Sequence, residues 1–249
     1  MPDEQFTNPS LAALYDPLHT DRPDLGAYLD IAREFSARQI LDVGCGTGTL
    51  ALLLAAQGHD VTGVDPARAS VDVARAKPGA ERVRWLDGDA TTLPDDVHVD
   101  LALMTGNAAQ AVVDEDVWEG TLRGVRAALR PGGRFVFETR DPARRAWEEW
   151  TPEESSRRVE VPGVGAVETW YEVTEVALPL VTFRTTFVVA GEVLTSMSTL
   201  RFRERDEVAA GLERHGFGVE EVRGAPDRPG REFVFFARAR AVVASGGES

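Results

Sequence analysis

The first 140 residues alternate between short apolar runs and longer segments with helical spacing of apolar positions. Five runs are typical of buried strands: 40–43, 59–65, 82–86, 97–104 and 134–139. Three of the four segments between these runs have the apolar spacing of helices, at 50–57, 67–76 and 116–129. Strands that alternate with helices predict a parallel sheet covered by helices, the α/β class.

The residues before the first strand predict a tail and two helices. Residues 1–9 have little periodicity, so we expect a frayed N-terminus. Ser10 is a suitable cap for a helix over 10–16 that Pro17 would end, and Asp24 is a suitable cap for a helix over 25–35. Both helices would precede the first strand.

Residues 157–203 have a different pattern, rich in Val, Thr, Phe and Tyr in alternation. Turn signals at Pro162-Gly163, Leu178-Pro179 and Ala190-Gly191 divide this segment into three or four antiparallel strands. A sheet of this size has too little core to stand alone. We therefore expect an insertion that packs on the rest of the chain as a lid and substrate wall, with a possible contact to a second subunit.

A helix over 206–215 and strands over 217–223 and 232–239 follow the insertion. We divide the chain into a core over 10–145, the antiparallel insertion over 146–204 and a return to the core over 205–240. Residues 241–249 are small and polar, and we expect them to be disordered.

A glycine-rich turn after the first strand is the strongest local signal. Gly44, Gly46 and Gly48 alternate with other residues and lead directly into a helix. Glycines permit positive φ and a close approach of backbone N–H groups to a ligand. A dinucleotide-binding turn would have its third glycine at position 49, where this chain has Thr49. The turn therefore predicts an anionic or polyhydroxylated ligand, and the spacing disfavours a pyrophosphate.

Composition excludes several classes of function. The net charge of -14 disfavours binding to nucleic acid or acidic lipid. No apolar run is long enough to cross a bilayer, and the N-terminus lacks the features of a secretory signal, so we expect a cytoplasmic protein without a membrane partner. The single Cys45 and four dispersed histidines predict no disulfide and no metal site. Cys45 is interpreted as a small residue that fills the turn.

The residues Leu41-Asp42-Val43-Gly44-Cys45-Gly46-Thr47-Gly48 resemble motif I of the S-adenosylmethionine-dependent methyltransferases with a Rossmann-like (class I) fold. Pro131-Gly132-Gly133, before the fifth strand, also resembles this family. The resemblance implies a seven-stranded doubly wound sheet whose last strand is antiparallel, with S-adenosylmethionine as cofactor and S-adenosylhomocysteine as product. The position of the β insertion is similar to that in aminosugar N,N-dimethyltransferases.

The strand ends and the resemblance together indicate the cofactor site. Asp65 ends the second strand, where a carboxylate can accept hydrogen bonds from both ribose hydroxyls. The resemblance implies that Asp89 meets the adenine amino group, with Asp87 as the alternative, and that the leading helices contact the methionine end. The expected cofactor residues are Tyr15, Arg22, Asp42, Gly44, Cys45, Gly46, Gly48, Asp65, Pro66, Asp89, Ala90 and Thr105.

The acceptor side is less defined in the sequence. Asn107 follows the fourth strand at the face where ligands bind, and its amide can orient an acceptor or cap the next helix. Trp147, Trp150, Trp170 and Tyr171 could line an aromatic pocket or pack the insertion on the core, and of these Trp147 and Tyr171 are the substrate residues that we expect. His19 is either a base for a hydroxyl acceptor or a loop histidine, so no catalytic residue is assigned.

The sequence therefore predicts methyl transfer to a nitrogen or oxygen atom of a small molecule by proximity and orientation. A non-catalytic protein that binds S-adenosylmethionine or a partner is the first alternative. A nicotinamide oxidoreductase is the second, and the glycine spacing disfavours it. The expected assembly is a monomer or a homodimer joined through the insertion.

Overall fold

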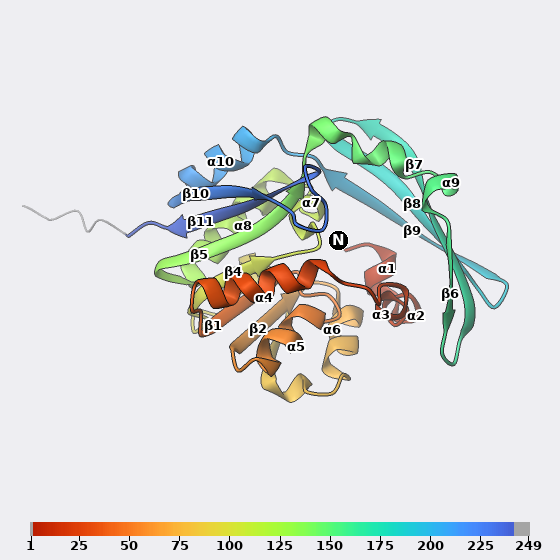
Figure 1. Ribbon diagram of the computed structural model, residues 1–249, viewed down its shortest axis with the longest axis horizontal. Coiled ribbons are helices and arrows are strands. Elements are labelled where there is room, and N and C mark those ends of the chain that lie inside the picture. Colours follow the sequence, from red (N-terminus) through yellow and green to blue (C-terminus); the bar gives the residue numbers. More distant parts are fainter. Residues whose placement is uncertain (1, 242–249) are drawn as a thin grey trace, which may run out of the picture.

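The computed structural model describes residues 2–241 and contains two sheets (Figure 1). The larger sheet has seven strands in the order β10-β11-β5-β4-β1-β2-β3. Neighbouring strands are parallel except β11, which is antiparallel to both β5 and β10. The strands are β1 (Gln39–Val43), β2 (Asp60–Asp65), β3 (Val83–Asp87), β4 (Val99–Met104), β5 (Leu129–Arg140), β10 (Phe217–Gly224) and β11 (Glu232–Ala239). The predicted seven-stranded Rossmann-like sheet is confirmed.

Helices cover both faces of this sheet because its strands carry apolar side chains on both sides. One core contains residues of α4 (Asp24–Glu34) and α5 (Thr49–Ala56), packed on Val136 of β5. The other contains residues of α8 (Glu115–Ala128) and α10 (Arg205–Arg214), packed on Phe135 and Phe137. The remaining helical segments are α6 (Arg68–Arg75), η1 (Ala80–Arg82), η2 (Ala90–Thr92), α7 (Ala108–Ala111), η3 (Pro142–Arg144), η4 (Ala146–Glu149) and α9 (Pro152–Ser155).

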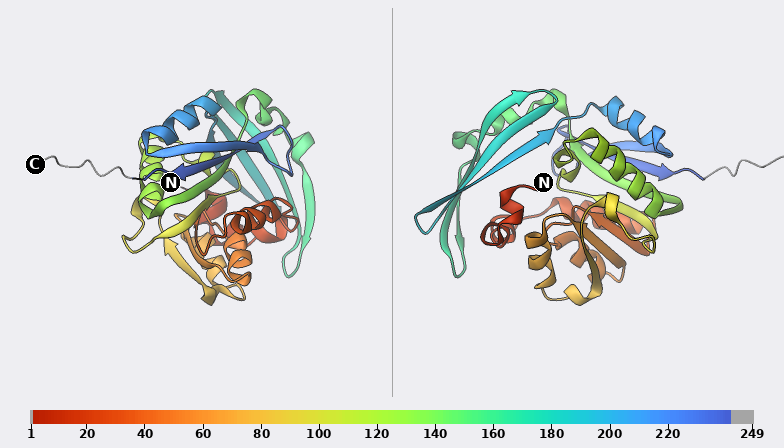
Figure 2. Two further views of the ribbon diagram at one scale, coloured as in Figure 1. Left: turned by 60° about the vertical axis from the view of Figure 1, so that its left-hand side comes forward. Right: turned by 180° about the vertical axis from the view of Figure 1, so that it is seen from behind.

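The insertion forms the second sheet, in the order β6-β7-β8-β9. Its strands are β6 (Arg157–Val161), β7 (Gly165–Ala177), β8 (Leu180–Val189) and β9 (Glu192–Arg201), all paired antiparallel. The three predicted breaks lie at its three turns, so the expectation of an antiparallel insertion is confirmed. The sheet curves around one side of the molecule (Figure 2).

The N-terminal residues lie between the two sheets, so the expected frayed tail is wrong for residues 2–9 (Figure 2). They form α1 (Glu4–Thr7) and lead into α2 (Pro9–Ala12) and α3 (Tyr15–Leu18). The backbone N–H of Gln5 donates to Ser196 Oγ of β9 at 3.0 Å, and Ser70 Oγ of α6 donates to the carbonyl of Phe6 at 3.0 Å. Tertiary contacts, which sequence periodicity does not reveal, thus order this short polar helix.

The inner face of the insertion sheet provides the apolar cover for α2 and α3. Leu11, Leu14 and Leu18 of this region pack against Val167 and Phe187 of the sheet. The insertion is therefore joined to the leading helices by a shared core. The sheet and these helices bury apolar surface that neither could bury alone.

Several predicted boundaries differ from the structure. The helix expected over 10–16 is divided: Asn8 instead of Ser10 caps α2, and Pro17 lies inside α3. Asp24 belongs to the first turn of α4 and does not cap it. Strand β5 begins at Leu129, so it includes the expected Pro131-Gly132-Gly133 turn. The disorder expected at the C-terminus concerns residues 242–249, which lie outside the described residues.

Within 2–241, no helix is long and apolar enough to cross a bilayer. The same residues contain no group of three or more His, Cys, Asp or Glu side chains that could hold a metal ion.

Candidate active site

The glycine turn leaves β1 at the carboxyl edge of the sheet and enters α5. Gly44, Gly46 and Gly48 have φ of +71°, +53° and +77°, a conformation that L side chains rarely adopt. A Cβ at Gly48 would lie 2.4 Å from the ring of Trp85, so this glycine is needed for packing. A Cβ at Gly46 would meet no atom within 4 Å. The turn therefore presents open space at Gly46, which suits a bound ligand.

Asp65 at the end of β2 is coupled directly to this turn. Its Oδ2 accepts a hydrogen bond from the Gly46 N–H at 2.8 Å, and its Oδ1 accepts one from the Ala67 N–H at 2.7 Å. Burial raises the pKa of this carboxyl, and the two backbone donors oppose the rise. Each carboxylate oxygen keeps a free lone pair. Asp65 can therefore hold the turn and still accept hydrogen bonds from ribose hydroxyls.

Asp42 adds a second carboxylate at the start of the turn. The side chain is 1% exposed, and its Oδ1 has no hydrogen-bond partner among the described residues. Burial and the neighbouring Asp65 raise its pKa to about 7, while Arg22 opposes the rise. The unpartnered oxygen of Asp42, together with the neighbouring carboxyl of Asp65, makes this side of the turn suitable for a cationic ligand.

The leading helices are attached to the turn through Asp16, a residue that we did not select from the sequence. Its Oδ1 accepts hydrogen bonds from Thr47 Oγ1 at 2.6 Å and Thr49 Oγ1 at 3.2 Å. Its Oδ2 pairs with Lys77 Nζ at 2.5 Å. A hollow of about 450 Å³ lies beside this contact, lined by Asp16, His19, Thr20, Arg22, Leu25, Thr49, Leu53 and Lys77.

Tyr15 and Arg22 both lie in this N-terminal region. Tyr15 stacks on His19, with ring centroids 4.4 Å apart, and burial raises its pKa. Arg22 pairs with Asp24 at 2.7 Å, and its side chain is 23% exposed. The structure therefore brings Arg22 close enough to Asp42 to influence its pKa.

The remaining expected cofactor residues lie along the same sheet edge. Asp89 caps η2, where its Oδ1 accepts from the Thr91 N–H at 2.8 Å, and Ala90 is 1% exposed. Asp87, the alternative, pairs with Arg75 at 3.0 Å. Cys45 is buried and unpaired, and burial raises the pKa of its thiol, which suits a filler. Pro66 is exposed and Thr105 is half-buried.

Asn107 is part of a buried polar network at the ends of β4 and β5. Its backbone N–H donates to Glu138 Oε1 at 3.2 Å, and its Nδ2 donates to Glu232 Oε1 at 3.0 Å. The Tyr28 hydroxyl also donates to Glu138. Asn107 has φ of +59° and is 3% exposed. The backbone N–H and the side-chain amide of Asn107 thus connect two carboxylates that we did not select from the sequence.

A sequence signal existed for Glu138 but was not used. Glu138 lies near the carboxyl end of a parallel strand, the edge where ligands bind in α/β sheets. Glu232 begins β11, and its partner Arg228, whose Nη1 donates at 2.6 Å, precedes that strand. No local pattern connects these two residues with Asn107.

The aromatic residues of the insertion divide between its two faces. Trp147 is 4% exposed and packs on Phe202 at 4.7 Å between ring centroids. Tyr171 packs edge-on against Phe183 at 5.7 Å, on the face that also covers the leading helices. Trp170 is paired with Thr186, whereas Tyr171 is paired with Thr185, so the two side chains point to opposite faces. An aromatic pocket that includes both Trp170 and Tyr171 is therefore wrong.

Both ring nitrogens of His19 have partners. The guanidinium of Arg157 can only donate, so Nε2 accepts from Arg157 Nη2 at 3.1 Å and Nδ1 donates to the carbonyl of Tyr15 at 2.7 Å. Burial and the charge of Arg157 lower the pKa of this histidine. The ring is therefore neutral and has no free lone pair for a substrate proton.

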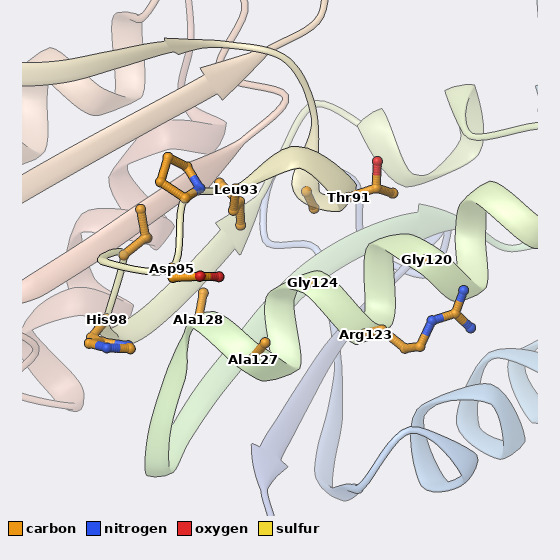
Figure 3. A pocket seen from close by; sticks show the side chains of 12 residues that line it. Thr91, Leu93, Asp95, His98, Gly120, Arg123, Gly124, Ala127 and Ala128 are labelled. Atoms are coloured by element: carbon orange, nitrogen blue, oxygen red, sulfur yellow. The ribbon is translucent and has the colours of Figure 1, made fainter.

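A second hollow, of about 550 Å³, lies between residues 90–98, which include η2, and helix α8 (Figure 3). A Cβ at Gly124 would lie 1.7 Å from the carbonyl oxygen of Ala90, so α8 touches η2 there. The labelled side chains come from these two segments, and none of them belongs to the glycine turn or the buried network. We interpret this hollow as a packing seam.

Comparison with known proteins agrees with this arrangement. A family model described as a methyltransferase domain matches residues 40–133. This part of the chain is therefore similar to a methyltransferase domain, in agreement with the resemblance of the glycine turn. The match covers the turn, β2, β3 and β4, which carry most of the expected cofactor residues. The predictions of the family, of its enzyme class and of S-adenosylmethionine as cofactor are thereby confirmed for the methyltransferase domain.

Two curated proteins and one solved structure are similar to this chain. The cypemycin N-terminal methyltransferase of a Streptomyces species is 33% identical over 119 residues, 48% of this chain and 49% of that protein. The ubiquinone biosynthesis O-methyltransferase of Coxiella burnetii is 28% identical over 138 residues, 55% of this chain and 57% of that protein. The chain thus spans about half the length of the curated relatives it matches.

The third relative is a solved structure, the CcbJ methyltransferase from Streptomyces caelestis. It matches with a TM-score of 0.75 at 22% identity and covers 93% of this chain and 96% of that chain. At this identity the match establishes the fold. The match extends beyond the methyltransferase domain, across most of the chain.

Proposed function

We propose that the protein transfers a methyl group from S-adenosylmethionine to a nitrogen atom of a small molecule. The observation that carries this proposal is the coupling of Asp65 to the open glycine turn through the Gly46 N–H at 2.8 Å. When bound, the cofactor supplies a methyl group on a positively charged sulfonium. The negative field of Asp42 and Asp65 suits that cation.

The protein residues mainly hold and enclose the reactants. Asp65 would accept hydrogen bonds from the ribose hydroxyls. Asp16 keeps α3 against the turn through its own hydrogen bond. Because methyl transfer is an in-line displacement, alignment and exclusion of water supply much of the rate. The nitrogen lone pair forms the new bond to carbon while the sulfur keeps the electrons of the old one, and the amine proton then leaves to water.

Both ring nitrogens of His19 are already hydrogen-bonded, which supports nitrogen over oxygen as the acceptor atom. A neutral amine needs no base, whereas a hydroxyl acceptor needs one to remove its proton. The ring of His19 is occupied by Arg157 and Tyr15. The two relatives differ on this point, since one is named as an N-terminal methyltransferase and the other as an O-methyltransferase.

Two measurements test the proposal. In calorimetry, S-adenosylhomocysteine should bind and NAD should not; the reverse result would contradict methyl transfer. The protein should then be incubated with S-adenosylmethionine and pairs of matched small amines and phenols, with products identified by mass spectrometry. We expect methylated amines. Methylation of phenols at rates equal to those of their matched amines would contradict the choice of nitrogen.

We also propose a cytoplasmic location and a monomer or a homodimer joined through the insertion. Composition alone supports the location. Val193 and Met197 on β9 are 62% and 43% exposed, which gives the insertion sheet apolar surface for a partner copy. Light scattering of the purified protein measures the assembly, and a trimer or larger particle would contradict it.

A further inference from the structure

Arg140, the last residue of β5, carries a guanidinium that the protein compensates incompletely. Its Nη1 donates to Gln110 Oε1 at 2.9 Å, and its guanidinium lies 5.5 Å from the ring centroid of Trp150. Neither Nε nor Nη2 has a hydrogen-bond partner within residues 2–241. The side chain is 21% exposed, so these donors can be reached by a ligand.

The carboxylate nearest to Arg140 already accepts hydrogen bonds from other donors. Glu232 Oε1 lies 3.9 Å from Arg140 Nε, beyond hydrogen-bond distance. The same oxygen accepts from Arg228 Nη1 at 2.6 Å and from Asn107 Nδ2 at 3.0 Å. Burial lowers the pKa of Arg140, although Glu232 partly opposes this effect. The ion pair between Arg140 and Glu232 is therefore long, and Arg140 keeps N–H donors for another acceptor.

Other arginines around this region have closer partners. Arg22 is paired with Asp24 at 2.7 Å, Arg228 with Glu232 at 2.6 Å and Arg201 with Glu115 at 3.2 Å. Arg157 donates to His19. The free Nε and Nη2 of Arg140 suit a single negative charge, and the planar fork of a guanidinium matches a carboxylate.

We propose that Arg140 binds a carboxylate group of the methyl acceptor, so that the acceptor is an amine that also carries a carboxylate. This inference rests on the proposed methyl transfer to nitrogen. Arg140 lies at the carboxyl edge of the sheet, as the glycine turn does, and Trp150, Phe183 and Tyr171 form the adjacent aromatic group. A ligand held here would have its charged group on Arg140 and its apolar part against these rings.

The probes for this proposal are amino acids and their carboxyl amides, compared in pairs that differ by one charge. Calorimetry measures the affinity of each member of a pair, with and without saturating S-adenosylhomocysteine. Aromatic and aliphatic pairs are both included, beginning with phenylalanine and phenylalanine amide. We expect the free acid of at least one pair to bind about tenfold or more tightly than its amide, because charge-assisted hydrogen bonds are lost in the amide.

Variants assign this preference to Arg140. Arg140→Gln should bring the ratio of acid to amide affinity close to one, and Arg140→Lys should keep part of it because the charge remains. Arg158→Gln is the matched control, since Arg158 lies on the exposed side of β6 and pairs with Glu168. This control should keep the full ratio. Affinity for S-adenosylhomocysteine should stay unchanged in all three variants.

The outcomes separate this proposal from the proposed function. Equal affinity for acid and amide across the panel, or a full ratio in Arg140→Gln, would overturn the carboxylate site. If circular dichroism shows that Arg140→Gln does not fold, Arg140→Lys serves as the test instead. In that variant, an unchanged ratio of acid to amide affinity, with both affinities also unchanged, would overturn the proposal. Failure to bind S-adenosylhomocysteine would instead overturn the proposed function, while the ratio without cofactor still tests Arg140.

Discussion

The proposed cofactor side and the proposed acceptor side of the site are built in different ways. On the cofactor side, a carboxylate meets a backbone N–H only 19 positions away, in the contact between Asp65 and Gly46. On the acceptor side, Tyr28 meets Glu138 across 110 positions, and Asn107 meets Glu232 across 125. One side depends on a local turn, whereas the other depends on side chains brought together by the whole fold.

This difference has a consequence for stability. The turn is held by backbone geometry, so single side chains there can change ligand binding while the fold survives. The acceptor-side network is buried, and removal of one member leaves other polar groups without partners. We therefore expect the largest losses of stability on the acceptor side and the largest losses of cofactor affinity at the turn.

The strongest test of this contrast is Glu232→Ala. The substitution leaves Arg228 and the Asn107 amide without their shared acceptor and removes the carboxylate 3.9 Å from Arg140, so the free energy of unfolding should fall by about 3–5 kcal/mol. Urea unfolding measures this loss. Glu220→Ala, which removes a surface partner of Arg134, is the control and should cost about 1 kcal/mol or less. Equal losses in the two variants would contradict the contrast.

Asp42→Asn tests the cofactor side through pH. The pKa of Asp42 is raised from 3.8 to about 7, so between these values the folded state keeps a proton that the unfolded state releases. Because the unfolded state alone loses this proton as the pH rises from about 4 to 7, the free energy of unfolding falls over that range, by at most roughly 4 kcal/mol. Asn cannot ionise, so this part of the pH dependence should disappear.

Thermal unfolding of the ligand-free protein between pH 4 and 8 measures the effect of Asp42→Asn. At pH 8 the variant should be more stable than the wild type. Asp95→Asn, at an exposed position, is the control and should keep the wild-type pH dependence. A variant with the same pH dependence as the wild type would show that Asp42 does not hold its proton in the folded state.

The smallest of the three effects is expected for Asp65→Ala. Affinity for S-adenosylhomocysteine should fall by about 2–3 kcal/mol because hydrogen bonds to a charged acceptor at the ribose are lost. Calorimetry gives the dissociation constant, and circular dichroism checks the fold. Asp60→Ala, at the other end of β2, should leave the affinity unchanged. An unchanged constant in Asp65→Ala would remove this residue from the site.

The sequence was sufficient where the structure depends on neighbouring residues. The alternation of strands and helices, the glycine turn and the three turns of the insertion all follow from local spacing, and each agrees with the structure. The sequence also placed Asp65 at the carboxyl edge of the sheet, where its side chain accepts from the Gly46 N–H, because a strand end places its last side chain at a known edge. Its contact with the ribose stays a prediction.

Tertiary structure alone decided the features that depend on distant partners. Residues 2–9 read as a tail, yet α1 is ordered by Ser196, Ser198 and Ser70. Arg140 showed no local signal, since its significance comes from a carboxylate 92 positions away that Arg228 and Asn107 already occupy. Periodicity records which face of an element is buried, but the burial, charge balance and free donors of a side chain depend on all the elements that surround it.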